Sequence, residues 1–536
     1  MPMRFFHQNF RPTHYVGGIF VITFLLLFCG SALFSLFSVQ GNYSWQALIH
    51  DQYLHHVLAF SLWQAFLSAV LSILFGFLVA RAFFYQHFNG KRFILKLFSL
   101  TFVLPSLVAI FGLLGVYGGS GWLAKFSIFL GSDWTPNIYG LTGILIAHLF
   151  FNIPLACKMF LQCLQSIPVQ QRQLAAQLNL RGWQFIRLIE LPYLRQQFFS
   201  AFMLIFMLCF TSFAIVLTLG GGPKYTTLEV AIYQAILFEF DLAKAALFAL
   251  LQCVICFMLF IFSSLWGNAS TVALHSKNHW QDKQSSAVQI WQGCLIVVVT
   301  GFVLLPLFNT AVSAFFSGKF FSLWASEQLW RALGYSFLIA PTAALLAVLM
   351  SVILLLLVRR LTWLHYHLFA QSLLNIGTMI LAIPTLVLAI GLFMLLREID
   401  FSTIHLFAIV VCCNALMAMP FVLRILAVPM QNNMLYYEKL CESLNIQGWQ
   451  RFKLIEWQAL RAPMQYAFAL ACTLSLGDFT AIALFGSQDF TSLPHLLYQQ
   501  LGHYRSQEAS VTAFILLLLC LLIFVVIERQ KEETND

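Results

Sequence analysis

Long apolar runs, separated by short intervals that hold most of the charged residues, extend along the whole chain. Each run covers roughly 18 to 28 residues, enough for a helix to cross the hydrocarbon core of a bilayer. Because lipid offers the backbone no hydrogen-bond partners, each run is expected to be helical. The runs begin near Val16, Val57, Phe98, Ile138, Phe198, Leu242, Ile290, Leu333, Leu373, Ile404, Met464 and Val511. They predict an all-α polytopic membrane protein with about 12 transmembrane helices.

The composition agrees with a bilayer environment and excludes a soluble globular fold. Of the 536 residues, 60% are hydrophobic and only 9% are charged, whereas soluble domains have about 25% charged residues. The first run follows Arg4 and Arg11, as the apolar region of a signal peptide would. It is too long for such a region and lacks a clear cleavage site, so we expect a retained signal anchor.

The positions of Lys and Arg indicate the orientation in the membrane. If the amino terminus is cytoplasmic, 22 of the 29 Lys and Arg residues fall in segments on the cytoplasmic side, in agreement with the positive-inside rule. We therefore expect a multi-pass protein of the bacterial inner membrane with both termini in the cytoplasm. The net charge of +9 then reflects topology and contact with anionic membrane lipids, and no nucleic-acid partner is expected.

An internal repeat divides the chain. The window Leu174–Leu194 matches the window Leu440–Leu460 at an offset of 266 residues, with about half of the positions identical. Further matched positions are Pro105 with Pro384, Pro154 with Pro420, Phe213 with Phe479 and Gly220 with Gly486. Six spans and one long loop thus occur twice in the same order, which predicts two parallel six-helix repeats related by an axis normal to the membrane.

The repeat predicts the domain organisation. Residues 1–267 are expected to form the first half, with its long loop near 166–195. Residues 290–536 are expected to form the second half, with the matching loop near 432–461. The polar stretch 268–289 between them is expected to be a cytoplasmic linker.

Both long loops show the pattern of amphipathic helices. In the first loop, Ser166 is a candidate helix start with Pro168 in the first turn, and apolar residues recur at spacings of three and four. Asn179 and Gly182 are expected to interrupt the helix, giving two short helices that present a protruding surface to a soluble partner. A helix that only lies on the lipid surface is the alternative, and the presence of two copies favours the partner.

The loops resemble the EAA loop of ABC importer permeases, which has the spacing E-A-A-x3-G-x9-I-x-L-P. The residues of the first loop that fall in register are Gln173, Leu174, Ala175, Asn179, Ile189, Leu191 and Pro192. The internal repeat adds Gly182 and Trp183 here, and Asn445, Gly448, Trp449 and Ile455 in the second loop. The resemblance implies the type I ABC importer permease fold, with these residues docking onto an ATPase.

The loops also depart from the family pattern. The family Glu is Gln173 in the first copy and Lys439 in the second, which puts contacts that depend on this Glu in doubt. The family Gly is replaced by Asn in both copies, but Asn tolerates a left-handed turn, so the break is expected to survive. The second copy has Trp457 and Gln458 in place of the Leu and Pro of the first, and the first loop is therefore expected to contribute more to coupling.

Further segments narrow the resemblance. LGGGP from Leu219, TTLEVAIYQA from Thr226, NALMAMP from Asn414 and SLGDF from Ser475 are similar to the permeases of bacterial thiamine and thiamine pyrophosphate importers. This similarity implies transport of thiamine, and of its phosphate esters, from a periplasmic thiamine-binding protein to the cytoplasm by alternating access. It also implies two copies of a cytoplasmic ATPase as partners.

The motifs of an enzyme are missing from the sequence. No GxxxxGK[ST] motif is found to cradle phosphate and Mg²⁺, and no set of His residues has metal-ligand spacing. We therefore expect no catalytic residues, no metal site and no cofactor on this chain, with ATP and Mg²⁺ bound by the partner ATPase.

Three other functions are compatible with parts of the pattern. A fused permease for ferric iron or another cation shares the two-half plan and the SLGDF segment. A secondary transporter would also have 12 spans, but it has no use for two matched docking loops. A membrane scaffold without a pore would show no substrate-dependent ATP hydrolysis in the reconstituted complex.

Asp478 is the main candidate for the substrate pathway. An ionisable group within a span is costly and is therefore a candidate functional residue. Asp478 corresponds to Ser212 in the repeat, and its carboxylate could attract the cationic thiazolium of thiamine. The alternative is that Asp478 only bonds to neighbouring helices.

Four prolines are also predicted to lie within spans, where each removes a backbone hydrogen bond and can bend its helix. They are Pro105, Pro154, Pro384 and Pro420. Bends of this kind could support movement of the two halves, or they could be static features of helix packing.

Overall fold

The computed structural model describes residues 13–38, 50–266, 285–396, 402–444, 446, 448–487 and 489–535. Within these ranges the chain forms helices and connecting segments without a β-strand, which confirms the all-α class. Ten described helices are long and apolar enough to cross a membrane, and a bent pair, Gly182–Arg195 with Gln197–Phe210, gives up to 11. Of the 12 predicted runs, the one near Leu373 does not form a single long helix among the described residues, because the chain is divided into shorter helices at Pro384.

The helices group into two compact units. Unit 1 combines α1 (Thr13–Ser38) with Ser322–Tyr504 and with the end of the chain from Ile515. Unit 2 combines the segment Asn42–Phe321 with Arg505–Phe514. The first helix of each sequence half therefore belongs to the unit that is built mainly from the other half. Residues 267–284, which make up most of the expected linker, lie outside the described residues.

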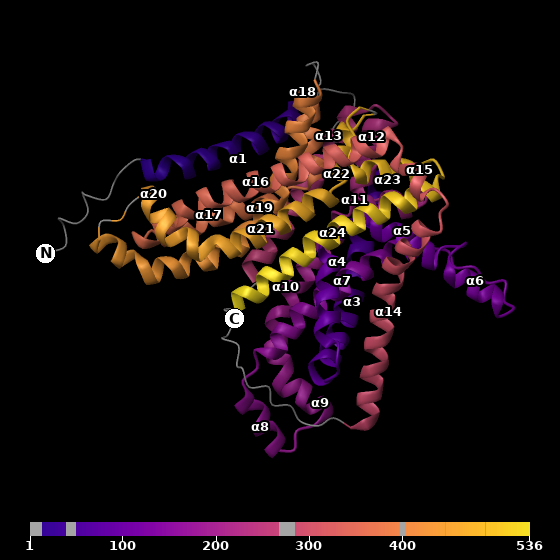
Figure 1. The fold of residues 1–536 in the computed structure, drawn as a ribbon, viewed down its shortest axis with the longest axis horizontal. Coiled ribbons are helices and arrows are strands. Elements are labelled where there is room, and N and C mark those ends of the chain that lie inside the picture. Colours follow the sequence, from indigo (N-terminus) through magenta and orange to yellow (C-terminus); the bar gives the residue numbers. More distant parts are fainter. Residues whose placement is uncertain are drawn as a thin grey trace. The chain divides into compact units, whose positions relative to one another are not determined.

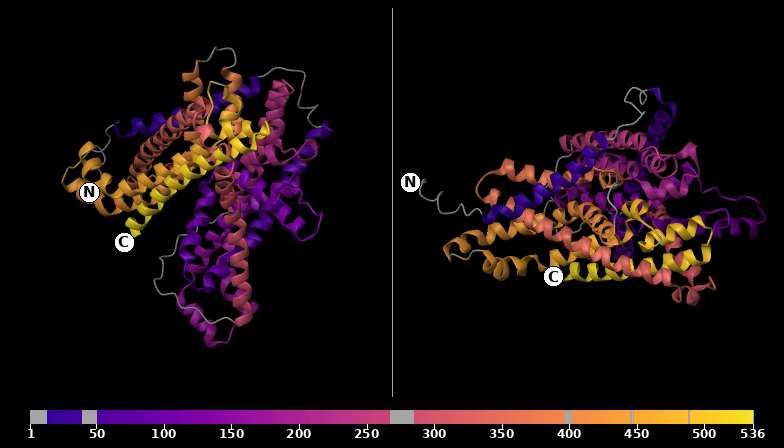
Figure 2. Two further views of the ribbon diagram at one scale, coloured as in Figure 1. Left: turned by 45° about the vertical axis from the view of Figure 1, so that its right-hand side comes forward. Right: turned by 90° about the horizontal axis from the view of Figure 1, so that it is seen from above.

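Unit 2 is built around the long helices α3, α7, α10 and α14, of which α3 contacts the other three (Figures 1 and 2). Its elements are α3 (Gln52–Tyr85), α4 (Lys91–Val103), α5 (Ser106–Tyr117), α6 (Trp122–Phe129), α7 (Leu141–Gln165), α8 (Val169–Gln177), α9 (Gly182–Phe185), η1 (Ile186–Glu190), α10 (Leu191–Phe210), α11 (Phe213–Leu219), η2 (Pro223–Tyr225), α12 (Leu228–Leu237), α13 (Leu242–Trp266) and α14 (Ser286–Phe315).

Unit 1 is built around α16, α19 and α21, which contact one another, with α1 lying along α16 and α18 (Figure 1). Its elements after α1 are α16 (Glu327–Trp363), α17 (His367–Met379), η3 (Ile380–Ala382), α18 (Thr385–Leu396), α19 (Thr403–Ser443), α20 (Gly448–Arg451), η4 (Phe452–Glu456), α21 (Trp457–Gly477), α22 (Thr480–Phe485) and α23 (Leu493–Gly502). Two further helices, α15 (Phe320–Trp324) and α24 (Ser506–Asn535), each have residues in both units.

The internal repeat is also present in the packing of each unit. In unit 2 the hydroxyl of Ser61 on α3 accepts a hydrogen bond from the backbone N–H of Leu228 at 2.8 Å. In unit 1 the hydroxyl of Ser336 on α16 accepts one from Leu493 N–H at 2.8 Å. Two aromatic pairs follow the same correspondence: Phe213 with Tyr233, whose ring centroids are 5.0 Å apart, and Phe479 with Tyr498, at 4.8 Å. The two halves thus share side-chain contacts as well as sequence.

The contact of each first helix with its unit depends on a glycine. A Cβ on Gly391 of α18 would lie 2.3 Å from the carbonyl oxygen of Ala32 on α1, and one on Gly112 of α5 would lie 2.4 Å from that of Pro306 on α14. Gly112 and Gly391 occupy the same place in the repeated PSLVAIFGL and PTLVLAIGL segments. Only a residue without a side chain permits this approach of two helices. Both units therefore hold their exchanged helix, α1 or α14, through a glycine at the same position of the repeat.

The four prolines fall into two classes. Pro154 and Pro420 lie inside α7 and α19, as predicted. The prediction is wrong for Pro105 and Pro384, which come directly before α5 and α18 rather than inside a helix. The residue before a proline disfavours helical geometry, so the chain ends one helix and begins another there.

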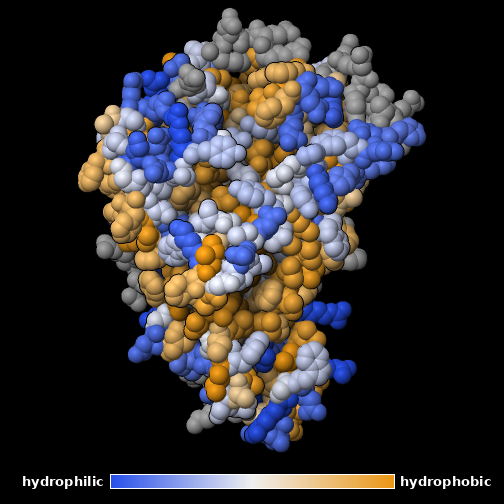
Figure 3. Space-filling model, turned by 90° about the vertical axis from the view of Figure 1, so that its right-hand side faces the viewer, coloured by the Kyte–Doolittle hydropathy of each residue, from blue (hydrophilic) through white to orange (hydrophobic). Residues whose placement is uncertain are grey.

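The surface of the helices is strongly apolar, as a bilayer requires. Figure 3 shows that apolar side chains cover much of the face that it displays. Many large apolar residues on the long helices are more than half exposed, among them Leu27, Trp63, Val297, Phe337 and Leu522. In water such a surface would drive aggregation, so these positions are expected to face lipid.

Candidate docking loops and an intramembrane polar site

The first long loop folds as two short helices joined by a left-handed turn, as predicted. Helix α8 ends before Asn179, which has a φ of 52°, and Gly182 has a φ of 57°. The N–H of Leu180 donates to the carbonyl of Ala175 at 2.9 Å, and Asn179 N–H donates to Ala176 at 3.0 Å. These two bonds form a Schellman cap, in which Asn takes the place usually held by Gly. Figure 1 shows α8 and α9 at one end of the unit 2 helices.

The second loop differs from the prediction at its start. No separate first helix forms, because α19 continues without a break to Ser443. The reason is that Pro168 of the first loop is replaced by Met434, which does not interrupt a helix. One hydrogen bond of the first turn has an equivalent here, since Ile446 N–H donates to the carbonyl of Cys441 at 2.9 Å, as Leu180 does to Ala175. Asn445 lies outside the described residues, while Gly448 and Trp449 lie in α20.

Both loops expose apolar side chains at the same four positions of the repeat. Leu178 is 63% exposed and its equivalent Leu444 60%, while Leu188 and Leu454 are each 56% exposed. The four exposed pairs are Leu174 with Leu440, Leu178 with Leu444, Leu188 with Leu454, and Leu191 with Trp457. We call the four residues of each loop its docking face. An apolar surface that recurs in both copies is typical of an interaction site.

The remaining predicted loop residues divide into exposed and buried positions. Gln173, Asn179, Gly182, Trp183 and Pro192 are exposed. Ala175 is buried, and Ile189 and Ile455 are half-buried, so these three hold their loops to the helices behind them. The predicted set therefore mixes surface residues with residues that support the surface.

A buried glutamate closes each loop, and the sequence prediction assigned it no role. Glu190 and Glu456 are 1% and 3% exposed, and each is the last residue of a π-helical turn, η1 or η4. Glu190 accepts a hydrogen bond from the hydroxyl of Tyr85 at 2.8 Å, and its other oxygen is paired with Arg81 Nε at 2.8 Å. Arg81 and Tyr85 lie at the end of α3, so the first loop is tied to that helix.

The second glutamate is part of a larger ionic cluster. Glu456 pairs with Arg359, near the end of α16, and accepts from Arg451 Nε at 2.9 Å. Arg451 also forms a bidentate pair with Glu438 of α19, one bond of which is 2.8 Å long. Burial alone would lower the pKa of Arg451, but hydrogen bonding and Coulombic attraction from the two glutamates outweigh burial and raise it above its usual value. The cluster therefore stabilises the charged form.

In the first loop, a buried arginine takes the place of Glu438. Arg172 is 5% exposed, donates to the carbonyl of Leu164, and places its guanidinium carbon 4.3 Å from the centre of the Phe84 ring. Burial lowers its pKa, while Tyr85 and Glu190 act in the opposite direction. The position of Arg451 is occupied by Phe185. The first loop thus lacks the bidentate pair of the second.

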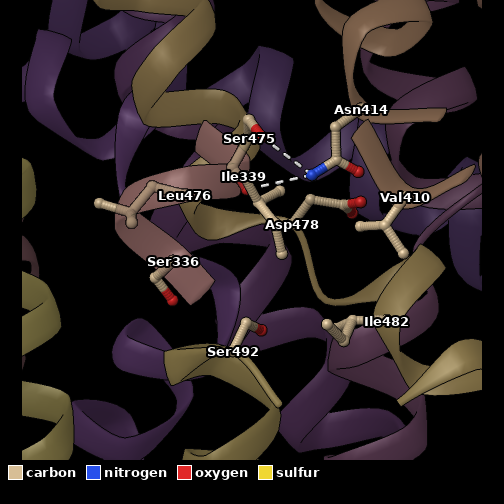
Figure 4. Close-up of a pocket in the computed structure, with 9 residues that line it drawn as sticks. All are labelled: Ser336, Ile339, Val410, Asn414, Ser475, Leu476, Asp478, Ile482 and Ser492. Atoms are coloured by element: carbon tan, nitrogen blue, oxygen red, sulfur yellow. Dashed lines mark hydrogen bonds between the residues drawn. The ribbon is translucent and has the colours of Figure 1, made fainter. Parts of the chain in front are cut away.

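A small polar site surrounds Asp478 in unit 1 (Figure 4). Asp478 follows α21, and one of its carboxylate oxygens accepts from Thr480 N–H at 3.1 Å, which caps α22. In the orientation drawn, Asn414 Nδ2 donates to Ser475 Oγ at 2.9 Å. Turning this amide over satisfies more groups, because Nδ2 then donates to the second Asp478 oxygen at 2.8 Å and Oδ1 accepts from Ser475.

The cavity at this site is small. Its volume is about 10 Å³, and it is lined by Ser336, Ile339, Val410, Asn414, Ser475, Leu476, Asp478, Ile482 and Ser492. A volume of about 10–15 Å³ holds a single water molecule, whereas pockets that enclose small organic ligands have roughly 300 Å³ or more. In this conformation the cavity does not admit an organic substrate.

The equivalent position in unit 2 has a different set of side chains and no acidic residue. His148, Cys209 and Ser212 replace Asn414, Ser475 and Asp478. Gln64, which takes the place of Ile339, donates to the carbonyl of Cys209 at 2.9 Å. His148 Nδ1 is 2.9 Å from the hydroxyl of Ser68. Ser212 is the residue before α11, and Asp478 lies two residues before the start of α22. Unit 2 therefore has a hydroxyl where unit 1 has a carboxylate.

Two copies of one helical membrane unit, each with an exposed apolar loop, agree with a membrane transport permease, the class of protein to which a family model assigns this chain. The family model for the binding-protein-dependent transport system inner membrane component matches residues 72–269 and 365–530. The chain belongs to this family. The first segment includes the loop of one half and the second includes the loop of the other.

The chain is also similar over nearly its whole length to several named permeases. It is 61% identical to the "Thiamine transport system permease protein ThiP" of Haemophilus influenzae, with 98% of both chains covered. It is 43% identical to the protein of the same name from Escherichia coli, with 97% of both chains covered. The Brucella abortus protein of this name is 38% identical, with 97% of this chain and 96% of the relative covered.

Proposed function

We propose that this chain is the permease of an ATP-driven importer that carries thiamine, and its phosphate esters, into the cytoplasm by alternating access. The observation that carries the proposal is full-length similarity to permeases named for thiamine transport, up to 61% identical. The matched docking faces support an ATP-driven system, since an ion-driven transporter needs no such surfaces. The full-length relatives do not favour the ferric iron alternative.

The proposal includes the partners and the orientation. Two copies of a cytoplasmic ABC ATPase would each contact one docking face, and a periplasmic thiamine-binding protein would deliver the substrate. ATP and Mg²⁺ would be bound by the ATPase, with no cofactor on this chain. The basic residues of the loops and termini support a bacterial inner-membrane protein with both termini in the cytoplasm.

The proposed substrate is tested by uptake of labelled thiamine. Cells that lack the permease gene are compared with the same cells expressing this chain together with its ATPase and binding protein. Thiamine accumulation that depends on the chain, and that excess unlabelled thiamine but not ferric iron abolishes, is the expected result. Accumulation of labelled iron instead would support the cation importer.

The proposed docking is tested by crosslinking at a matched pair of positions. Leu188→Cys and Leu454→Cys place a thiol at equivalent sites of equal exposure, 56% each. These positions are better than Gly182, where the φ of 57° strains any side chain. Both variants are expected to crosslink to the ATPase in the purified complex, and the chain with its native thiols alone is the control. Absence of a crosslink at both sites would refute docking through these loops.

For the substrate pathway we propose Asp478 and Ser212, the equivalent residues of the two halves. A carboxylate near the path would attract the positive charge of the thiazolium, and the hydroxyl of Ser492, which lines the cavity beside it without a hydrogen-bond partner, would be available for a hydrogen bond. The cavity is too small for thiamine in this conformation, so contact requires a state in which α21 and α22 move apart from α16 and α19. Transport by the Asp478→Asn variant is the test, and its expected outcome is given in the Discussion.

A further inference from the structure

The two buried glutamates of the docking loops have the same structural setting in both units. Each ends a π-helical turn, and each is paired with an arginine four residues before the end of a long helix, Arg81 on α3 or Arg359 on α16. The partners are about 100 residues apart in the sequence, so neither pair is a local feature of its loop. A contact that recurs in both copies between distant segments is a specific connection from loop to helix.

The helices that hold the arginines also reach the polar site in the membrane. On α3, Ser61 accepts the bond from Leu228 N–H and lies 20 residues before Arg81, which is about 30 Å along a helix. On α16, Ser336 lines the cavity beside Asp478 and lies 23 residues before Arg359, about 35 Å away. In each unit, one continuous helix therefore connects the arginine that pairs with the buried glutamate of the loop to a buried serine about 30 to 35 Å away.

We propose that Glu190 and Glu456 are positioning residues that transmit movement of the docking loops to α3 and α16. This inference rests on the proposed function, because it requires an ATPase to move the loops. A buried carboxylate cannot leave its arginine without leaving an unpaired charge in the protein. Loop and helix are thus expected to move together, and the helix carries the displacement to the polar site.

The two anchors are expected to differ in strength. Without the carboxylate of Glu456, Arg451 still holds Glu438 of α19, and Arg360 lies 3.9 Å from Glu438. The first loop has no second acidic residue at the corresponding place, where Arg172 is found. Loss of the carboxylate should therefore disturb coupling more at Glu190 than at Glu456.

The test measures transport and ATP hydrolysis in the same proteoliposomes, which contain the full complex with ATPase and binding protein. For Glu190→Gln we expect thiamine uptake per ATP hydrolysed to fall about tenfold, within the usual range of coupling between distant sites. For Glu456→Gln a fall of about threefold is expected, within the range for a residue that modulates the coupling without touching either ligand. A role in folding alone would reduce uptake and hydrolysis together, and that result, or an unchanged ratio in both variants, would overturn the inference.

Three further variants keep the test decisive, and two of them alter the first anchor. Glu190→Asp retains the charge and is expected to recover part of the lost ratio. Tyr85→Phe removes only the hydrogen bond to Glu190, so if Glu190→Gln does not assemble, this milder variant is expected to lower the ratio about twofold. An unchanged ratio in an assembled Tyr85→Phe complex would then count against the inference.

The third variant is the matched control, Glu239→Gln. This residue forms an ion pair of 2.8 Å with Lys244, the same length as the Arg81–Glu190 pair, but its side chain is 45% exposed. Thiamine uptake per ATP hydrolysed by the Glu239→Gln complex should equal that of the unmodified complex. If the unmodified complex itself takes up no thiamine, the proposed function fails; if only the ratios of the variants are unaltered, the positioning role fails and the proposed function stands.

Discussion

The two docking loops present the same surface but are attached to the protein in different ways. Their four exposed apolar positions match pair by pair, whereas the ionic contacts behind them do not. Behind the first loop, one glutamate is held by Arg81 and Tyr85; behind the second, two glutamates share Arg451 and bring in Arg359. The comparison indicates that the partner-facing surface and its attachment are separate features, one shared by the halves and one free to differ.

The largest expected effect tests the shared surface. The double change Leu174→Asp with Leu178→Asp, and the matched Leu440→Asp with Leu444→Asp, places charges in the apolar docking face. Each pair should weaken ATPase binding about 100-fold, the cost of losing two interface anchors. The measurement is the number of ATPase copies retained on purification, with Phe316→Asp, on an exposed residue outside the loops, as control. Loss at only one loop would show that the faces are not equivalent.

A smaller effect is expected at the glycine contacts, where the halves should again agree. Gly112→Ala and Gly391→Ala each place a Cβ within 2.4 Å of a carbonyl oxygen of the facing helix. Overpacking of this kind destabilises by about 1–3 kcal/mol, so both variants should lower the thermal unfolding temperature of the detergent-solubilised protein by similar amounts. Gly301→Ala on α14, which has open space around its Cβ, should leave the temperature unchanged. A fall in only one of the two variants would mean that the exchanged helices are held differently.

The intramembrane sites should differ between the halves. Asp478→Asn removes the only carboxylate of the described cavity lining while keeping the cap on Thr480. Thiamine uptake is expected to fall about tenfold, the effect of one lost charge interaction, and assembly with the ATPase should be normal. Ser212→Ala should change uptake less than about twofold, because its hydroxyl can be replaced by water. Unaltered uptake by an assembled Asp478→Asn complex would leave this residue with a structural role only.

The smallest effect concerns the turn of the first loop. Asn179→Ala puts a less tolerant residue at a φ of 52°, at a cost of about 1 kcal/mol, whereas Asn179→Gly should be neutral or slightly favourable. ATPase affinity, measured by titration of the purified permease, is expected to fall about threefold for the Ala variant only. Equal affinities for both variants would mean that the turn geometry does not limit docking.

Features that depend on local pattern could be predicted from the sequence. Apolar runs predicted the helices, and the offset of 266 residues between Leu174 and Leu440 located both loops and their matched faces. The left-handed turn at Asn179 followed from the residue type alone. The break in the helix before α8 was predicted from Pro168. The second loop has Met434 at the equivalent position, so the continuous helix α19 could have been predicted as well.

Features that depend on distant segments were not accessible in the same way. Glu190 and Glu456 were visible as identical positions of the repeat, but their partners lie on other helices, and the only signal was that Arg81 and Arg359 each stand at the end of an apolar run. Pro105 and Pro384 were placed inside spans because hydropathy does not distinguish a kink from a chain break. The exchange of α1 and α14 between units involves tertiary contacts, at two glycines of the repeat, that no local pattern encodes.

The exchange of first helices has a consequence for biosynthesis. Helix α14 is made after α3 and α5 and meets its neighbours as soon as it enters the membrane. Helix α1 is made first, but α16, the first of its two partner helices to be made, begins only at Glu327, about 290 residues later, which is a delay of roughly 15 to 60 s at 5–20 residues per second. During this time α1 stands in the lipid without its native contacts. Nascent chains stalled before α16 should therefore be the form most exposed to membrane proteases and insertion chaperones, and unit 1 the last part of the molecule to mature.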